Sequence, residues 1–276
     1  MTSITLHTAP RTRVIAVEQF RAVGLALRNE AIFFVSALFV FGVIAIAGAV
    51  RFTETAHGPN AHMGFHYSAA GAVPMFLVAL LLPFGVWRSE DPARRAYHWS
   101  MPVARGPHTL MKVLSGWGWL MIATMAYLLY VVVVASLVGK ITGEHAWQGT
   151  TPAWEWLVAF TAPTIGYLLT SIPVIGSDHP WRWIGGVVIG YTILIALLQS
   201  FGMVEIANAL NTISNGRYGL NAALFGSTHD GARGVTIGVT REAMSALRMS
   251  TWIIAMPIWM AASAVAVAVT SYRHHE

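Results

Sequence analysis

Six long stretches of this chain contain no Asp, Glu, Lys, Arg or His. They cover residues 31–50, 71–87, 113–139, 156–175, 184–204 and 250–270. A helix rises about 1.5 Å per residue, so each stretch comes close to the ~20 residues that a helix needs to cross the hydrocarbon core of a bilayer. The sequence therefore predicts an all-α membrane protein with six transmembrane helices.

The composition agrees with a single domain built in a membrane. The 276 residues are 55% hydrophobic and 11% charged, with a mean hydropathy of +0.58, and a six-helix bundle uses most of them. We expect one transmembrane domain over residues 1–276. The sequence has no cysteine, which excludes disulfides and thiolate metal sites. The charge-free spans argue against a proton-coupled carrier or a voltage sensor, because such proteins keep ionisable groups at membrane depth.

The segment before the first span, residues 13–28, has the spacing of an amphipathic helix. Its apolar residues recur at helical intervals, opposite a charged side formed by Arg13, Glu18, Arg21 and Arg28. We expect a helix that lies in the membrane interface, and a disordered basic tail is the alternative. The first apolar stretch starts too late and runs too long for a cleavable signal peptide.

The distribution of Lys and Arg predicts the orientation. Eleven of the 17 lie in the N-terminal segment, in the connections between spans two and three and between spans four and five, and in the C-terminal tail; six lie on the opposite side. Basic residues favour the cytoplasmic side, so both termini should be cytoplasmic. Because these residues are sorted by loop, no nucleic-acid partner is expected. The predicted location is a cell membrane, crossed several times, and in a bacterium the inner membrane.

The cytoplasmic connection at residues 88–112 predicts a short helix over 92–99. Two acidic residues followed by Pro92 make a favourable helix start. The segment mixes residue types that are enriched at protein–protein contacts. The candidate partner-binding residues are Glu90, Asp91, Arg94, Arg95, Tyr97, His98 and Trp99. The alternative is a solvated basic loop that follows the positive-inside rule.

After this helix the chain reads Met101-Pro102-Val103-Ala104-Arg105, with Lys112 further on. With the six-span layout and the basic N-terminal helix, this pattern resembles a type-2 ABC transporter permease, whose motif runs leucine-proline-valine/isoleucine-serine-arginine and then lysine. Met101 and Ala104 depart from it. The resemblance implies that residues 88–112 are a coupling segment that docks on a separately encoded ABC ATPase. It also implies a second permease chain, identical or related.

The chain carries no phosphate-binding loop of the Gly-x-x-x-x-Gly-Lys-[Ser/Thr] type. We therefore expect this chain to be no enzyme and to bind no cofactor. ATP and Mg would be held by the partner ATPase.

The connection at residues 205–249 is predicted to lie on the external side. Its apolar segments at 207–213 and 220–225 suit short re-entrant helices, and an external cap without a transport role is the alternative. Residues 241–249 predict a helix that leads into the last span.

Histidines form one cluster, His57, His62 and His66, in the first external loop. Such a group could hold a copper or zinc ion, or it could belong to a solvated polar loop. Glycine and proline interrupt its spacing, so we assign no metal site.

Two polar residues within the fifth span, Tyr191 and Gln199, are candidates to line a substrate path. Hydrogen bonds between helices are the more common role of such residues in membrane spans. A path without ionisable groups favours a hydrophobic or amphipathic cargo taken from the membrane, and export over import.

Our hypothesis is the membrane-spanning permease subunit of an ATP-driven ABC exporter. The first alternative is a non-transporting membrane scaffold or assembly factor that binds a cytoplasmic partner through the same helix. The second is a lipid-modifying membrane enzyme. It has the least support, because the acids of this chain are scattered rather than gathered with His at one interface.

Overall fold

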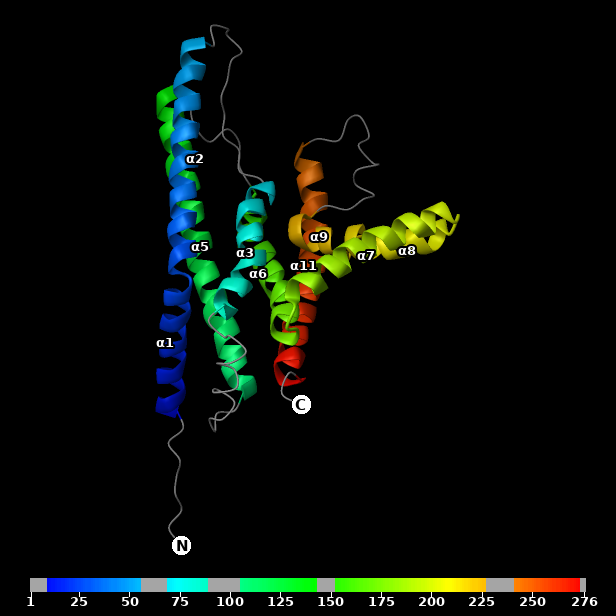
Figure 1. Ribbon diagram of the computed structural model, residues 1–276. Helices are drawn as coiled ribbons and strands as arrows, with labels where there is room; N and C mark the ends of the chain where they lie inside the picture. Colours follow the sequence, from blue (N-terminus) through cyan, green and yellow to red (C-terminus); the bar gives the residue numbers. More distant parts are fainter. Residues whose placement is uncertain (1–8, 56–68, 89–104, 143–151, 227–240, 274–276) are drawn as a thin grey trace.

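A computed structural model describes residues 9–55, 69–88, 105–142, 152–226 and 241–273. Every regular element in these ranges is a helix, as Figure 1 shows. The elements are α1 (Ala9–Ala26), α2 (Arg28–Thr55), the 3-10 helix η1 (Ala69–Ala72), α3 (Val73–Trp87), α5 (Arg105–Thr142), α6 (Ala153–Gly176), α7 (Pro180–Ser200), α8 (Val204–Asn215), α9 (Leu220–Phe225) and α11 (Arg241–Arg273). The predicted all-α fold is confirmed.

Five of the described helices are long and apolar enough to cross a membrane: α2, α5, α6, α7 and α11. The chain is therefore an α-helical membrane protein. The predicted second span, residues 71–87, is shorter than the others. It forms the end of η1 and then α3, whose 15 residues rise only about 22 Å, against a hydrocarbon core of about 30 Å.

Helix α6 is the centre of the bundle, and it contacts α3, α5, α9 and α11. Tyr167 of α6 is fully buried, and its hydroxyl donates a 2.9 Å hydrogen bond to the carbonyl of Val113 in α5. Gly116 lies beside this hydroxyl, and a Cβ there would come within 2.3 Å of the oxygen. A side chain at position 116 would thus push α5 away from α6.

A second layer forms where α1 and α2 pack along α5. Phe20 of α1 stacks on Trp119 of α5 with ring centroids 4.9 Å apart, and the Trp119 indole donates to the Phe20 carbonyl at 3.0 Å. Higher up, Gly42 of α2 lies against the ring and hydroxyl of Tyr130. The predicted N-terminal helix at residues 13–28 thus corresponds to α1, and it contacts the bundle directly.

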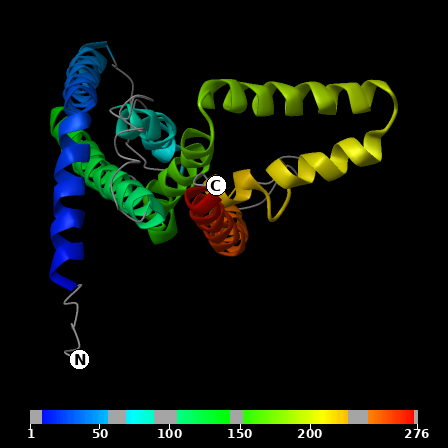
Figure 2. The ribbon, with the colours of Figure 1, turned by 60° about the horizontal axis from the view of Figure 1, so that its bottom comes forward.

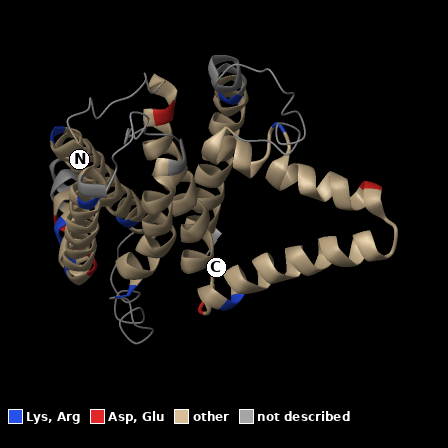
Figure 3. Ribbon diagram, turned by 90° about the horizontal axis from the view of Figure 1, so that it is seen from above, with Lys and Arg blue, Asp and Glu red and all other residues tan. Residues whose placement is uncertain are grey.

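Apart from the helices of the α7–α8 arm, many of the described helix ends gather at one of the two ends of the bundle (Figure 1). The start of α1, the start of α5, the turn between α6 and α7, and the end of α11 lie at one end. Figure 3 shows that Lys, Arg, Asp and Glu lie mostly at helix ends and on α1, while the bodies of the long helices carry none. The sidedness of the termini relative to a membrane stays a prediction.

Helix α7 leaves the bundle as an arm, and α8 returns beside it (Figures 1 and 2). The predicted fifth span, 184–204, ran through this turn. In the structure α7 ends at Ser200 because Gly202 adopts a left-handed conformation with φ of 74°, and α8 then begins at Val204. A continuous apolar sequence therefore contains a chain reversal.

The predicted region at 205–249 contains α8, α9 and the start of α11. Helix α9 coincides with the predicted apolar segment 220–225, and α11 includes the helix predicted at 241–249. Helix α9 contacts both α6 and α11, and the Trp259 indole of α11 donates to the Tyr218 carbonyl just before α9 at 2.9 Å. The region is thereby tied to the centre of the bundle.

Candidate functional site

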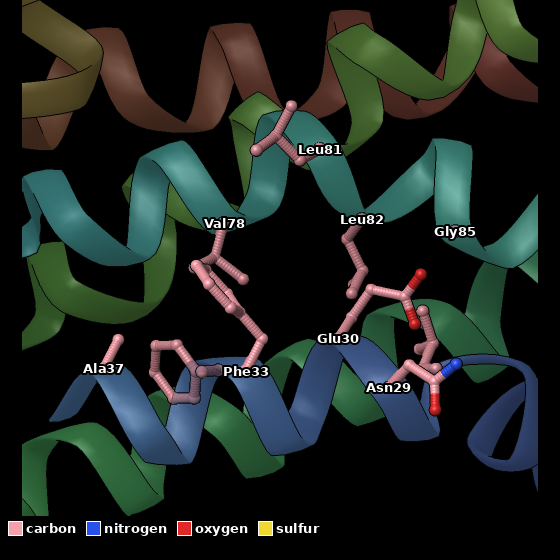
Figure 4. A pocket seen from close by; sticks show the side chains of 10 residues that line it. Asn29, Glu30, Phe33, Ala37, Val78, Leu81, Leu82 and Gly85 are labelled. Carbon is pink, nitrogen blue, oxygen red and sulfur yellow. The ribbon is translucent and has the colours of Figure 1, made fainter. Parts of the chain in front are cut away.

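An apolar groove lies between α2 and α3, with a volume of about 400 Å³. Figure 4 shows its two walls, with Phe33 and Ala37 on α2 facing Val78 and Leu82 on α3. Small-molecule sites in proteins are commonly 300–1,000 Å³ and mostly apolar. The groove therefore has the size and the lining of a ligand site.

A carboxylate stands at one end of this groove. Glu30 lies in the first turn of α2, where an acidic residue is favoured by the helix dipole. Its Oε1 lies 3.5 Å from a guanidinium nitrogen of Arg88, the residue that follows α3. Its Oε2 is buried and has no hydrogen-bond partner within the described part of the chain. The Glu30 side chain as a whole is 41% exposed, so its carboxylate can be reached from the groove.

The groove can hold an apolar chain, and its end can receive a hydrogen-bond donor. In Figure 4 the Glu30 carboxylate lies next to Leu82 and Gly85, at the opposite end from Ala37. The sequence analysis placed Glu30 outside the first span, because that span was defined by the absence of charge. The helix begins at Arg28, so Glu30 belongs to the membrane-length helix itself.

The arm formed by α7 and α8 is the second unusual feature. None of the residues of α7 is buried, although the helix is apolar and 21 residues long. Its first turn is anchored by Trp181, whose ring stacks on Phe84 of α3 with centroids 4.0 Å apart. Beyond this anchor the helix projects away from the bundle, as the view from above in Figure 3 shows.

The two residues predicted to line a substrate path both lie on this arm. The Tyr191 hydroxyl donates to the Leu210 carbonyl of α8 at 2.8 Å and lies 3.1 Å from the Ser214 hydroxyl. Gln199 is exposed near the end of α7. Tyr191 therefore ties the two helices of the arm together, and the role of both residues in a path stays a prediction.

The predicted partner-binding residues at 90–99 lie outside the described residues, as do His57, His62 and His66. The helices that flank the coupling segment are described, and they touch where they meet it. The Lys112 ammonium of α5 lies 4.4 Å from the ring centroid of Trp87, the last residue of α3. This contact holds the two ends of the segment close together.

A second acid missed by sequence reasoning lies at the other end of the bundle. Glu155, in the first turn of α6, is buried, and its Oε2 has no hydrogen-bond partner among the described residues. The only sequence signal was its place one residue before the apolar run. No group of three or more His, Asp or Glu suited to a metal ion occurs in the described ranges.

Comparison of the chain with protein-family models, with curated proteins and with solved structures gives no match.

Proposed function

We propose that this chain is the membrane-spanning permease subunit of an ATP-driven exporter, energised by a separately encoded ABC ATPase. The observation that carries the proposal is the arm. An apolar helix of membrane length that buries no residue within its own chain leaves its whole surface open to lipid or to a second chain. Half of a transport pathway has this property, because the pathway closes only when a second chain is added.

The surface of α7 supports pairing with a second permease chain, identical or related. Gly186 and Gly190 form a Gly-x-x-x-Gly pattern, and a Cβ at either position would meet no atom within 4 Å. This spacing lets two membrane helices approach closely. In contrast, Gly42 of α2 is already occupied by Tyr130 within the chain. The arm thus offers a helix-packing face that the chain itself leaves open.

The ATPase would dock at the end of the bundle that holds the coupling segment. The end of α3 and the start of α5 meet there, and the basic helix α1 starts at the same end. We propose that this end of the bundle is cytoplasmic and that both termini lie on the cytoplasmic side. Helix α3 together with η1 would then form a short sixth span. Thinning of the bilayer or flanking interfacial residues can accommodate a short span at modest cost.

Charge reversal in the coupling segment tests the ATPase. The double variant Arg94→Glu, Arg95→Glu should lose the ATP hydrolysis that co-purifies with the tagged wild-type chain. It should still fold, because exposed loop charges contribute little to stability. Arg182→Glu, an exposed arginine in the first turn of α7, is the control and should retain the activity. Undiminished ATP hydrolysis in the double variant would point to a scaffold or assembly factor instead.

Reconstituted vesicles test the energy source. Within the described residues, the charged side chains of the membrane-length helices, such as Glu30, Lys112 and Glu155, lie toward the helix ends and form no continuous proton relay across the membrane. Movement of an amphipathic cargo should therefore need ATP and should be unaffected when the proton gradient is collapsed. Cargo movement driven by a pH gradient in the absence of ATP would refute the mechanism.

A further inference from the structure

We propose that the groove between α2 and α3 binds a phospholipid whose head group carries a primary amine, of the phosphatidylethanolamine class. The acyl chain lies along the apolar walls, the ammonium donates to Glu30, and the phosphate pairs with Arg88. This site requires only a membrane-embedded chain. It goes beyond the exporter proposal and stands independently of the ATPase.

The walls of the groove suit an acyl chain that enters from the bilayer. Asn29 to Ala37 span about 12 Å along α2, and apolar side chains of α3 face them. Phe33 is 77% exposed and Leu81 59% exposed, so the walls are open toward the lipid side. An acyl chain that moves from the bilayer into the groove was not in contact with water before, so its binding is favoured by packing contacts with the two helices and not by the hydrophobic effect.

The head group is selected by the carboxylate of Glu30. The Glu30 side chain is 41% exposed and its Oε1 faces Arg88, so a ligand in the groove can reach it. A primary ammonium donates N–H hydrogen bonds to a carboxylate, while a quaternary ammonium has none to donate. The amine should therefore be preferred over choline at this position.

The neighbouring arginine makes the site suited to a zwitterion rather than to a simple cation. The Arg88 side chain is 78% exposed and carries a positive charge 3.5 Å from the same carboxylate. A phosphate beside the ammonium pairs with this guanidinium, whereas an alkylamine would only be repelled by it. The carboxylate of Glu30 and the guanidinium of Arg88 are therefore complementary in charge to the ammonium and the phosphate of an ethanolamine phosphate head group.

A second groove in the same protein shows why the carboxylate matters. It lies between α8 and α11, has a volume of about 380 Å³, and is lined by Ala209, Thr212, Ile213, Tyr218, Ile258, Trp259 and Ala262. It matches the first groove in volume but contains no charged side chain. It can accept an apolar chain but has no group that distinguishes one head group from another.

Lipid binding to the purified full-length chain tests this site. Native mass spectrometry in mild detergent would compare phosphatidylethanolamine, phosphatidylcholine and phosphatidylglycerol with identical acyl chains. The wild type should bind phosphatidylethanolamine about tenfold more tightly than the other two, as expected for one charge-assisted hydrogen bond. In the Glu30→Gln variant, the affinity for phosphatidylethanolamine should fall to the affinity for phosphatidylglycerol.

Groove-filling variants separate this site from general lipid adhesion. Ala37→Trp fills the α2–α3 groove and should abolish the preference, whereas Ala209→Trp fills the other groove and should leave it intact. Unfolding temperatures of all variants verify that each one is folded. Equal affinity of the wild type for the three phospholipids, or an unchanged preference in Glu30→Gln, would overturn the site. Dodecylamine binding as tightly as phosphatidylethanolamine would overturn the role of the phosphate.

Discussion

Gly116 shows how a single residue controls the approach of two central helices. Its lack of a side chain leaves room for the hydroxyl of Tyr167, which is fully buried and reaches the Val113 carbonyl. In a membrane, helices gain little from excluding water, so close packing and hydrogen bonds between helices contribute much of the association energy. The pair Gly116 and Tyr167 contributes both effects at one point.

A double-mutant cycle at this pair gives a prediction at the residue scale. Gly116→Ala should destabilise the wild type by about 1–3 kcal/mol, because its Cβ would lie 2.3 Å from the Tyr167 hydroxyl oxygen. In a Tyr167→Phe background, that oxygen is absent and the cost should be smaller. Unfolding free energies in mixed micelles measure the coupling. Gly48→Ala is the control: a Cβ at position 48 would meet no atom within 4 Å, so this variant should leave the free energy of unfolding nearly unchanged. If Gly116→Ala lowered the free energy of unfolding equally in both backgrounds, the contact between position 116 and the Tyr167 hydroxyl would be contradicted.

At the scale of helices, the sequence predicts where apolar helices occur better than where they point. The stretches at 113–139, 156–175 and 250–270 lie within α5, α6 and α11, and 220–225 coincides with α9. The direction of α7 was not predictable, because lipid and protein neighbours are equally apolar and select the same side chains. Glu30 and Glu155 were missed for a related reason: spans defined by the absence of charge stop just short of them.

The open face of α7 leads to a prediction about assembly. Gly186→Ile and Gly190→Ile should each weaken dimer formation at least tenfold, since bulky side chains block close approach of the helices. Mass measurement at several concentrations in mild detergent would follow the dimer. Val188→Ile lies on the opposite side of α7 and should leave the dimer intact. A wild-type chain that stays monomeric, or glycine variants that dimerise normally, would refute this interface.

At the scale of the whole molecule, different helix ends lie at the two ends of the bundle. One end gathers the start of α1, the start of α5, the turn between α6 and α7 and the end of α11. The ends of α2 and α5 lie at the other. The loop charges predict that the first of these ends is cytoplasmic, because basic residues favour that side of a membrane.

Single cysteines can test the sidedness, because the natural chain contains none. Ser177→Cys, in the turn between α6 and α7, should react with a membrane-impermeant maleimide only in inside-out vesicles. Thr53→Cys is exposed near the end of α2. It should react only when the reagent reaches the external face of the membrane that holds the protein, as in right-side-out vesicles. Labelling of both positions from the same side would contradict the two-sided arrangement.

Helix α5 is far longer than the membrane is thick, and this gives it the mechanical property of a lever. Its 38 residues rise about 57 Å, and they begin at Arg105, within the predicted coupling segment at 88–112. The contact with Tyr167 near Gly116 lies about 16 Å from that start and about 39 Å from the far end at Thr142. A rod that pivots at this contact would amplify a displacement of Arg105 more than twofold at Thr142. A small push at one face of the membrane would thus become a larger swing at the other.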